Sequence, residues 1–315
     1  MRYGRLGDSG LAVSVVGLGC NNFGRRIDRD ASHAVVDTAI TAGVTLFDTA
    51  DSYGTPPGTS EQFLGEALKG RRDDVIVATK FGHDLRGANG PDWGARGSRR
   101  YVLRAVEASL RRLDTDWIDL YQLHYPDEET PVEETLATLT DLVKEGKVRY
   151  IGCSNVAGWQ VADAAWTASS AGLAGFISVQ NEYSLLDRSI EAEVVPACER
   201  FGLGVLPYFP LAQGLLTGKF RRGEPAAPGT RLATRPEVLD SADWDVVEAL
   251  AAFVEERDVG LLDVAIGWLA AQPAVASVIA GATRPEQVPA NVAAVEWIPS
   301  VEDLAALDAI TASRR

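Results

Sequence analysis

The chain has 315 residues, 46% hydrophobic and 23% charged, with a formal net charge of −14. This length suits one large α/β domain or two small ones, and the acidic balance argues against a nucleic-acid-binding surface, which needs a clustered basic face. Three widely spaced cysteines, three histidines without an H-x-H or H-x-x-x-H pair, and the lack of an apolar stretch of 18 residues argue against a disulfide framework, a histidine metal centre and a membrane span. We therefore expect a cytoplasmic protein without a metal.

In chain order, the first 18 residues break into short pieces separated by glycines, and residues 11–16 are apolar except at Ser14. That pattern predicts a small β-hairpin, followed by a first buried strand that ends at Gly19.

From residue 30 onward, helical and strand patterns alternate. Short apolar runs followed by polar or Gly/Pro residues predict strands at 44–50, 75–80, 117–123, 148–153, 176–179, 204–207 and 275–280. Apolar residues recurring every three or four positions predict helices at 30–42, 60–69, 98–113, 132–145, 157–170, 189–201, 242–257, 261–271, 285–294 and 301–312. Ser98 is a suitable N-cap for its helix, and 212–240, rich in Gly, Pro, Arg and Thr, is predicted to be a long loop.

Strands that alternate with helices in this way favour an α/β fold, the (β/α)8 TIM barrel, with an N-terminal β-hairpin and extra C-terminal helices. No G-x-G-x-x-G follows the first strand, which weakens a doubly wound dinucleotide-binding alternative. The alternation continues beyond the long loop, so we expect one domain over 1–315.

Active sites of such barrels lie where the strands end at their carboxyl face. Each predicted strand is followed there by polar or aromatic residues, which are Gly19 and Asn22, Asp48 and Tyr53, Lys80, His124, Ser154 and Asn155, Gln180, Tyr208, and Gly281 with Thr283 and Arg284. A single such residue is weak evidence, but a whole rim of them predicts an active site.

Four of these residues form a coherent acid–base set. A tyrosine hydroxyl has an ordinary pKa near ~10, and a neighbouring ammonium lowers it. Lys80 could supply that charge to Tyr53, and Asp48 could hold the buried amine by a counter-charge. His124 could orient a carbonyl oxygen beside Tyr53 or share the proton. Such a group would protonate a developing alkoxide.

The rest of the rim suits a cofactor. Ser154, Asn155 and Gln180 have neutral donor and acceptor groups that fit a carboxamide, and Tyr208 offers a face on which an aromatic ring can stack. Segment 281–287 combines a glycine, a hydroxyl and a guanidinium at a predicted helix start, where a phosphate would be held.

Several ordered motifs carry a family resemblance. They are FDTA (47–50) with YG (53–54), ATK (78–80), DLYQLH (119–124), GKVR (146–149), IGCSN (151–155), QNEY (180–183) and GLLTGK (214–219). The chain resembles the aldo-keto reductases in these motifs, and the similarity runs along nearly its whole length.

The resemblance implies a (β/α)8 barrel that reduces aldehydes or ketones with extended NADPH and without a metal. By position, Tyr53 matches the general acid, Lys80 and Asp48 its tuning pair, and His124 the histidine that orients the substrate. Arg284 favours NADPH over NADH. The expected contacts to NADPH/NADP⁺ are Gly19, Ser154, Asn155, Gln180, Tyr208, Leu211, Gly214, Lys219, Gly281, Thr283, Arg284, Gln287 and Asn291.

A small carbonyl substrate is the expected partner, with no nucleic acid and no membrane, while nothing in the sequence fixes the oligomeric state. The expected pocket walls are Asn22, Phe23, Trp93, Tyr125 and Phe209, and Phe209 replaces a serine common in related proteins. One alternative is a regulatory subunit of the same fold that holds the nucleotide with little turnover. Another is a glycosidase using Asp48 and Glu182, which leaves Lys80 and Tyr53 unexplained.

Overall fold

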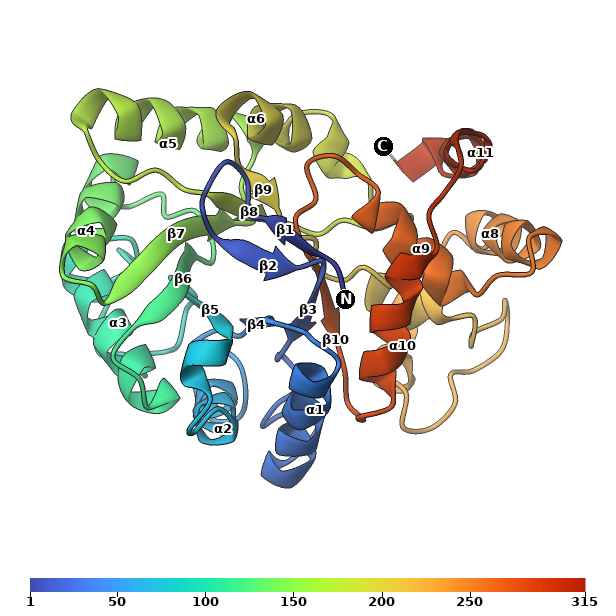
Figure 1. The fold of residues 1–315 in the computed structure, drawn as a ribbon, viewed down its shortest axis with the longest axis horizontal. Helices are drawn as coiled ribbons and strands as arrows, with labels where there is room; N and C mark the ends of the chain where they lie inside the picture. The colour runs from blue at the N-terminus through green and yellow to red at the C-terminus, as the bar shows by residue number, and fades with distance from the viewer. Residues whose placement is uncertain (315) are drawn as a thin grey trace.

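The computed structural model describes residues 1–314, in which eight parallel strands curl into a barrel (Figure 1). In sheet order they are β10 (Val278–Gly281), β3 (Val16–Gly19), β4 (Leu46–Asp48), β5 (Ile76–Phe81), β6 (Ile118–Leu123), β7 (Val148–Ser154), β8 (Ser178–Gln180) and β9 (Gly204–Val205). The ends meet where Val205 bridges Val275 and where the Ala276 amide donates to the Val205 carbonyl at 3.0 Å. The predicted (β/α)8 barrel is confirmed.

The predicted hairpin is also present and covers one end of the barrel. It consists of β1 (Tyr3–Arg5) and β2 (Ala12–Ser14), paired antiparallel, and Figure 1 shows it lying across the barrel opening. Leu6 and Val13 are fully buried against Leu46 and Leu120 from the barrel interior. Because this apolar plug fills the amino-terminal end, the carboxyl ends of the strands are left to form the site.

The helices surround the barrel (Figure 1). They are α1 (Arg29–Thr41), α2 (Thr59–Ala67), α3 (Arg99–Leu113), α4 (Val132–Lys144), α5 (Gly158–Ala171), α6 (Val194–Phe201), α7 (Pro236–Asp240), α8 (Trp244–Glu256), α9 (Leu261–Ala270), α10 (Gln287–Ala293) and α11 (Val301–Ile310). Ser98 occupies the N-cap position of α3 as predicted, but its hydroxyl donates to the Ala95 carbonyl at 2.6 Å and makes no side-chain cap bond to the helix.

Two segments differ from the predicted elements. The expected loop 212–240 contains the 3₁₀ helices η3 (Ala212–Thr217) and η4 (Leu232–Thr234) and also α7, which starts at a proline, a residue suited to the first turn of a helix. The predicted helix 189–201 is split into η2 (Ser189–Glu191) and α6, because Glu193 leaves the helical region at φ −134°. Short helical turns of this kind carry little periodic signal in a sequence.

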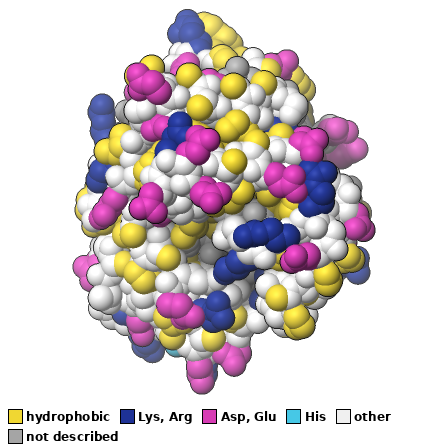
Figure 2. Space-filling view, turned by 90° about the vertical axis from the view of Figure 1, so that its right-hand side faces the viewer, with side chains coloured by type: hydrophobic (Ala, Val, Ile, Leu, Met, Phe, Trp, Pro, Cys, Tyr) yellow, Lys and Arg dark blue, Asp and Glu magenta, His cyan; other side chains and the backbone are white. Residues whose placement is uncertain are grey.

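Figure 2 shows one face of the molecule, where acidic and basic side chains are mixed and Lys and Arg side chains border a hollow near the middle. None of the helices in residues 1–314 is both long enough and apolar enough to cross a membrane.

Candidate active site

A cleft of about 950 Å³ opens at the carboxyl ends of the strands. It collects most of the residues predicted from the sequence, namely Gly19, Asn22, Asp48, Tyr53, His124, Tyr125, Ser154, Asn155, Gln180, Tyr208, Phe209, Leu211, Gly214, Lys219, Gly281, Thr283, Arg284 and Gln287. Ligand pockets typically measure ~300–1,000 Å³, so the cleft has room for a large ligand.

Asp48, which lines the cleft, forms a buried ion pair with Lys80 beneath it. The Lys80 ammonium donates to Asp48 Oδ2 at 2.6 Å and to the Thr49 carbonyl at 3.0 Å. Burial alone would lower the pKa of Lys80, but the Asp48 carboxylate and the nearby Tyr53 raise it above its ordinary value. Lys80 is therefore a fixed positive charge below Tyr53, as the sequence suggested.

The second carboxylate oxygen of Asp48 is also satisfied. Gln180 Nε2 donates to Oδ1 at 2.9 Å, and Gln122 Nε2 donates to the same atom at 3.2 Å. The sequence reasoning missed Gln122. The alternation of side chains along a strand indicates this position. Residues 120, 122 and 124 share one face, so Gln122 is a polar residue that points into the barrel.

Tyr53 lies between Lys80 and His124. The Lys80 ammonium is 5.1 Å from the centroid of the Tyr53 ring. Burial raises the pKa of Tyr53 and outweighs the charge of Lys80, which lowers it, so the net shift is upward. The expected downward influence of Lys80 is present but is not the larger effect, and Tyr53 holds its proton at neutral pH.

His124 meets the Tyr53 ring edge to face, with centroids 5.9 Å apart, and stacks on Tyr125 at 5.0 Å. Burial, then the charges of Lys80 and His83, lower its pKa well below the ordinary value of 6.5, so the imidazole is neutral. Its Nδ1 is buried and has no hydrogen-bond partner in residues 1–314. A neutral imidazole can orient a ligand by one hydrogen bond, whereas protonation would be costly here.

The amide and hydroxyl groups predicted to meet a carboxamide lie side by side. The Ser154 hydroxyl donates to the Gln180 carbonyl at 2.6 Å, and Asn155 Nδ2 donates to the His124 carbonyl at 2.9 Å. The Tyr208 hydroxyl donates to Asn155 Oδ1 at 2.8 Å. Asn155 adopts φ 56°, an uncommon backbone conformation that is typical of functional sites.

The far end of the cleft combines glycine, amide and guanidinium groups. Gln287 Oε1 accepts from the Thr283 amide at 2.8 Å and from the Arg284 amide at 3.1 Å, and these bonds shape the turn before α10. The helix therefore begins at residue 287 rather than at the predicted residue 285. The Arg284 side chain is 64% exposed and pairs with Glu286 at 3.0 Å. An anion arriving there meets an accessible guanidinium.

Two positions of the rim leave little room for a side chain larger than that of glycine. A Cβ added to Gly19 would lie 3.1 Å from Ile279 Cγ2, and one added to Gly281 would lie 3.3 Å from Asn22 Nδ2. The volume of the cleft and the cationic residues Lys219 and Arg284 fit an extended dinucleotide with phosphate groups.

Besides Lys80, which is buried beneath the cleft, three residues predicted for the site do not line it. Phe23 is fully buried in the hydrophobic core, because the loop after β3 folds inward over it. Trp93 is 72% exposed and packs against the Arg100 guanidinium, 4.8 Å from its ring centroid. Asn291 is buried in α10. Glu182, the second carboxylate of the glycosidase alternative, lies outside this cleft in a smaller pocket.

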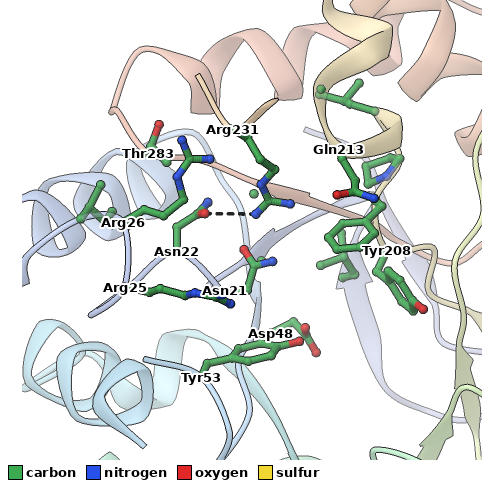
Figure 3. A pocket seen from close by; sticks show the side chains of 18 of the residues that line it. Asn21, Asn22, Arg25, Arg26, Asp48, Tyr53, Tyr208, Gln213, Arg231 and Thr283 are labelled. Carbon is green, nitrogen blue, oxygen red and sulfur yellow. Dashed lines mark hydrogen bonds between the residues drawn. The ribbon is translucent and has the colours of Figure 1, made fainter. Parts of the chain in front are cut away.

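Three arginines in the cleft were not predicted from the sequence. Figure 3 shows Arg25, Arg26 and Arg231 in the cleft near Asn22, with Tyr53 and Asp48 below Arg25 in the view. Arg231 donates to Asn22 Oδ1 at 3.2 Å. The sequence signal was a pair of adjacent basic residues shortly after the first strand end. Among residues 1–314, no group of three or more His, Cys, Asp or Glu side chains is placed to hold a metal ion.

Known proteins resemble this chain along its length. The model of the Aldo/keto reductase family matches residues 15–312. An uncharacterized oxidoreductase, YrpG, of Bacillus subtilis is 37% identical over 94% of this chain and 91% of its own. A probable voltage-gated potassium channel subunit beta of Oryza sativa is 36% identical (95% and 92%). L-Glyceraldehyde 3-phosphate reductase of Escherichia coli O157:H7 is 33% identical (98% and 92%).

Proposed function

The chain belongs to the aldo/keto reductase family, and on that premise we propose that it reduces an aldehyde or ketone to the alcohol with NADPH as the reductant. The observation that carries the proposal is the meeting of Tyr53 and His124 in one cleft directly above the buried pair of Asp48 and Lys80. This arrangement provides a proton donor, a charge that supports it and a neutral orienting group.

Tyr53 is the proton donor to the carbonyl oxygen. Its raised pKa keeps the hydroxyl protonated at neutral pH, so the acid is present before each turnover. Once the proton leaves, Lys80 stabilises the phenolate, and Asp48 holds the ammonium in place. His124, neutral because its pKa is lowered, offers a hydrogen bond to the same carbonyl oxygen.

The cofactor site extends along the cleft. NADPH, when bound, supplies the hydride to the carbonyl carbon. Ser154, Asn155 and Gln180 hold the carboxamide, while Tyr208 offers its ring for stacking. Arg284, at the far end, favours the 2′-phosphate of NADPH over the hydroxyl of NADH.

Replacing Tyr53 by Phe tests the reaction. The variant keeps the ring but loses the acidic proton, so kcat for aldehyde reduction should fall by about 10²-fold or more. The measurement is steady-state NADPH oxidation with a panel of small aldehydes. The dissociation constant of NADPH, measured by fluorescence titration, should stay within about twofold, which distinguishes lost chemistry from lost binding. Undiminished reduction by Tyr53→Phe contradicts the proposal.

The same assay addresses the regulatory alternative. The rice relative is named as a probable channel subunit, yet this chain holds the complete set of Asp48, Tyr53, Lys80 and His124. A regulatory subunit would bind NADPH and leave every aldehyde unreduced, whereas an enzyme would turn over at least one of them.

A further inference from the structure

Three guanidinium groups gather in the cleft without an acidic partner among the described residues. Arg25 and Arg26 lie on the loop between β3 and α1, and Arg231 comes from the long segment after η3. No carboxylate in residues 1–314 lies within 4.0 Å of any of the three. In Figure 3, Arg26 and Arg231 flank Asn22, and Arg25 extends beside Asn21.

These arginines are only weakly held by the protein itself. Arg26 donates to the Gly229 carbonyl at 3.4 Å, and Arg231 donates to Asn22 Oδ1 at 3.2 Å. The Arg25 guanidinium makes no hydrogen bond to any described residue. Most of the donors on these three side chains are therefore available to a ligand.

The cluster is electrostatically unfavourable as it stands. Burial lowers the pKa of Arg231 to about 10, and the charges of Arg26, Arg235 and Arg25 add to that shift. Burial and then Arg25 lower the pKa of Arg26 as well. An anion that binds between these guanidinium groups would offset their mutual repulsion by its attraction to each of them.

The cluster is part of a protein with an acidic overall charge. The protein has 44 acidic residues against 30 basic ones. Some arginines elsewhere have carboxylate partners, as Arg99 has Asp141 at 2.6 Å and Arg257 has Asp303 at 2.6 Å. In an acidic protein, a group of arginines that faces a cleft and lacks such partners is a site for an anionic ligand.

We assign the anion to the substrate, because Arg25 and Arg26 lie on the same loop as Asn21 and Asn22, and Figure 3 shows the Arg25 side chain extending across the cleft above Tyr53. Lys219 and Arg284 also line the cleft and are left for the phosphates of the cofactor. We propose that Arg25 and Arg26 bind a phosphate or carboxylate group of the carbonyl substrate, so that small anionic aldehydes are preferred to neutral ones. This inference rests on the proposed function.

The kinetic test uses matched aldehydes. Succinic semialdehyde carries a carboxylate and butanal has the same chain length without one, and glyceraldehyde 3-phosphate pairs in the same way with glyceraldehyde. For the wild type at low salt, kcat/KM should be about tenfold or more higher for each anionic member. In the double variant Arg25→Met/Arg26→Met, kcat/KM for the anionic member should fall about 10- to 100-fold more than for its neutral partner.

The control is Arg99→Met, which removes an exposed arginine outside the cleft and should keep the wild-type preference. An equal loss for anionic and neutral aldehydes in the double variant overturns the inference. So does a rise of the NADPH dissociation constant that accounts for the whole loss, since the arginines would then serve the cofactor.

A binding measurement keeps the inference testable apart from the reaction. Glycerol 3-phosphate, which has no carbonyl to reduce, is titrated by calorimetry into the wild-type complex with NADP⁺ and into the same complex of the double variant. Binding to the wild type with a loss of about tenfold or more in the double variant supports the anion site even where no aldehyde is turned over, a result that defeats only the proposed function. Absence of binding to the wild type overturns the anion site.

Discussion

Lys80 in the barrel interior and Arg25 at the mouth of the cleft are both cations, but among the described residues only Lys80 has a carboxylate partner. Lys80 and Asp48 are almost completely buried, and the Lys80 ammonium donates to Asp48 Oδ2 at 2.6 Å. Gln122 and Gln180 donate to the other carboxylate oxygen, Oδ1. At the mouth, residues 1–314 supply arginines without a carboxylate partner.

Lys80 has a charge that acts within the protein, whereas Arg25 has a charge that is available to a ligand. A buried ion must be paired, because removal from water costs several kcal/mol. Paired in this way, Lys80 is held at a fixed place and can act on Tyr53. A half-exposed arginine is stabilised by water, so the protein can leave it unpaired until an anion arrives.

The largest effect is expected for Lys80→Met, which breaks the compensated interior pair. Asp48 is then left buried without its counter-charge, and breaking a buried pair costs about 3–5 kcal/mol in the free energy of unfolding. Tyr53 also loses the cation that supports its phenolate, so kcat should fall by about 10²-fold or more. Urea denaturation and steady-state NADPH oxidation measure the two effects separately.

The double variant Asp48→Asn/Lys80→Met serves as the control for this prediction. It removes both charges and keeps an amide oxygen that can accept from Gln122 and Gln180, so it should be more stable than Lys80→Met while remaining inactive. A double variant that is less stable than Lys80→Met would show that the unpaired charge of Asp48 is not what lowers the free energy of unfolding in the single variant.

An intermediate effect is expected for Arg284→Met, because Arg284 is exposed like the mouth arginines but already has a carboxylate neighbour. Loss of one charge-assisted bond to a phosphate corresponds to about 1.5–3 kcal/mol, so NADPH should bind about 10-fold or more weakly and NADH about as before. Fluorescence titration at fixed ionic strength measures both affinities.

Glu286→Gln is the matched control for Arg284→Met. It frees the Arg284 guanidinium from its acidic neighbour, so NADPH should bind at least as tightly as to the wild type. If Arg284→Met weakens NADH as much as NADPH, the 2′-phosphate is not what Arg284 recognises.

The interior half of this comparison was accessible from the sequence. Strand ends are marked by a change from apolar to polar residues, and the barrel rule gathers those ends at one face, which brought Asp48, Lys80 and His124 together. Gln122 was missed because it lies within the apolar run of β6 rather than after it.

The mouth was less accessible because long-range loop packing builds it. Arg231 reaches Asn22 only when the segment after η3 folds back over the cleft, and no local pattern encodes that contact. Phe23 and Trp93 lie in loops, where an aromatic side chain can turn into the core or out to solvent; Phe23 does the first and Trp93 the second.

The smallest effect is expected at the mouth, in the stability of the ligand-free protein. Arg26→Met removes one long hydrogen bond to the Gly229 carbonyl and also removes repulsion from Arg25, so the free energy of unfolding should stay within about 0.5 kcal/mol of the wild type. Inorganic phosphate should then separate the two proteins. At ten times its dissociation constant, a ligand stabilises the native state by about 1.4 kcal/mol, and this increment should shrink in Arg26→Met.

Thermal unfolding in phosphate and in chloride at equal ionic strength measures that increment, with Arg99→Met as the control that should keep the wild-type response. A loss of more than about 1 kcal/mol for Arg26→Met in chloride would mean that Arg26 stabilises the fold, as Lys80 does. The contrast between the interior and the mouth would then fail, because both Lys80 and Arg26 would stabilise the folded protein. If the stabilisation by phosphate disappears only in Arg26→Met, Arg26 serves to bind an anion and not to stabilise the ligand-free fold.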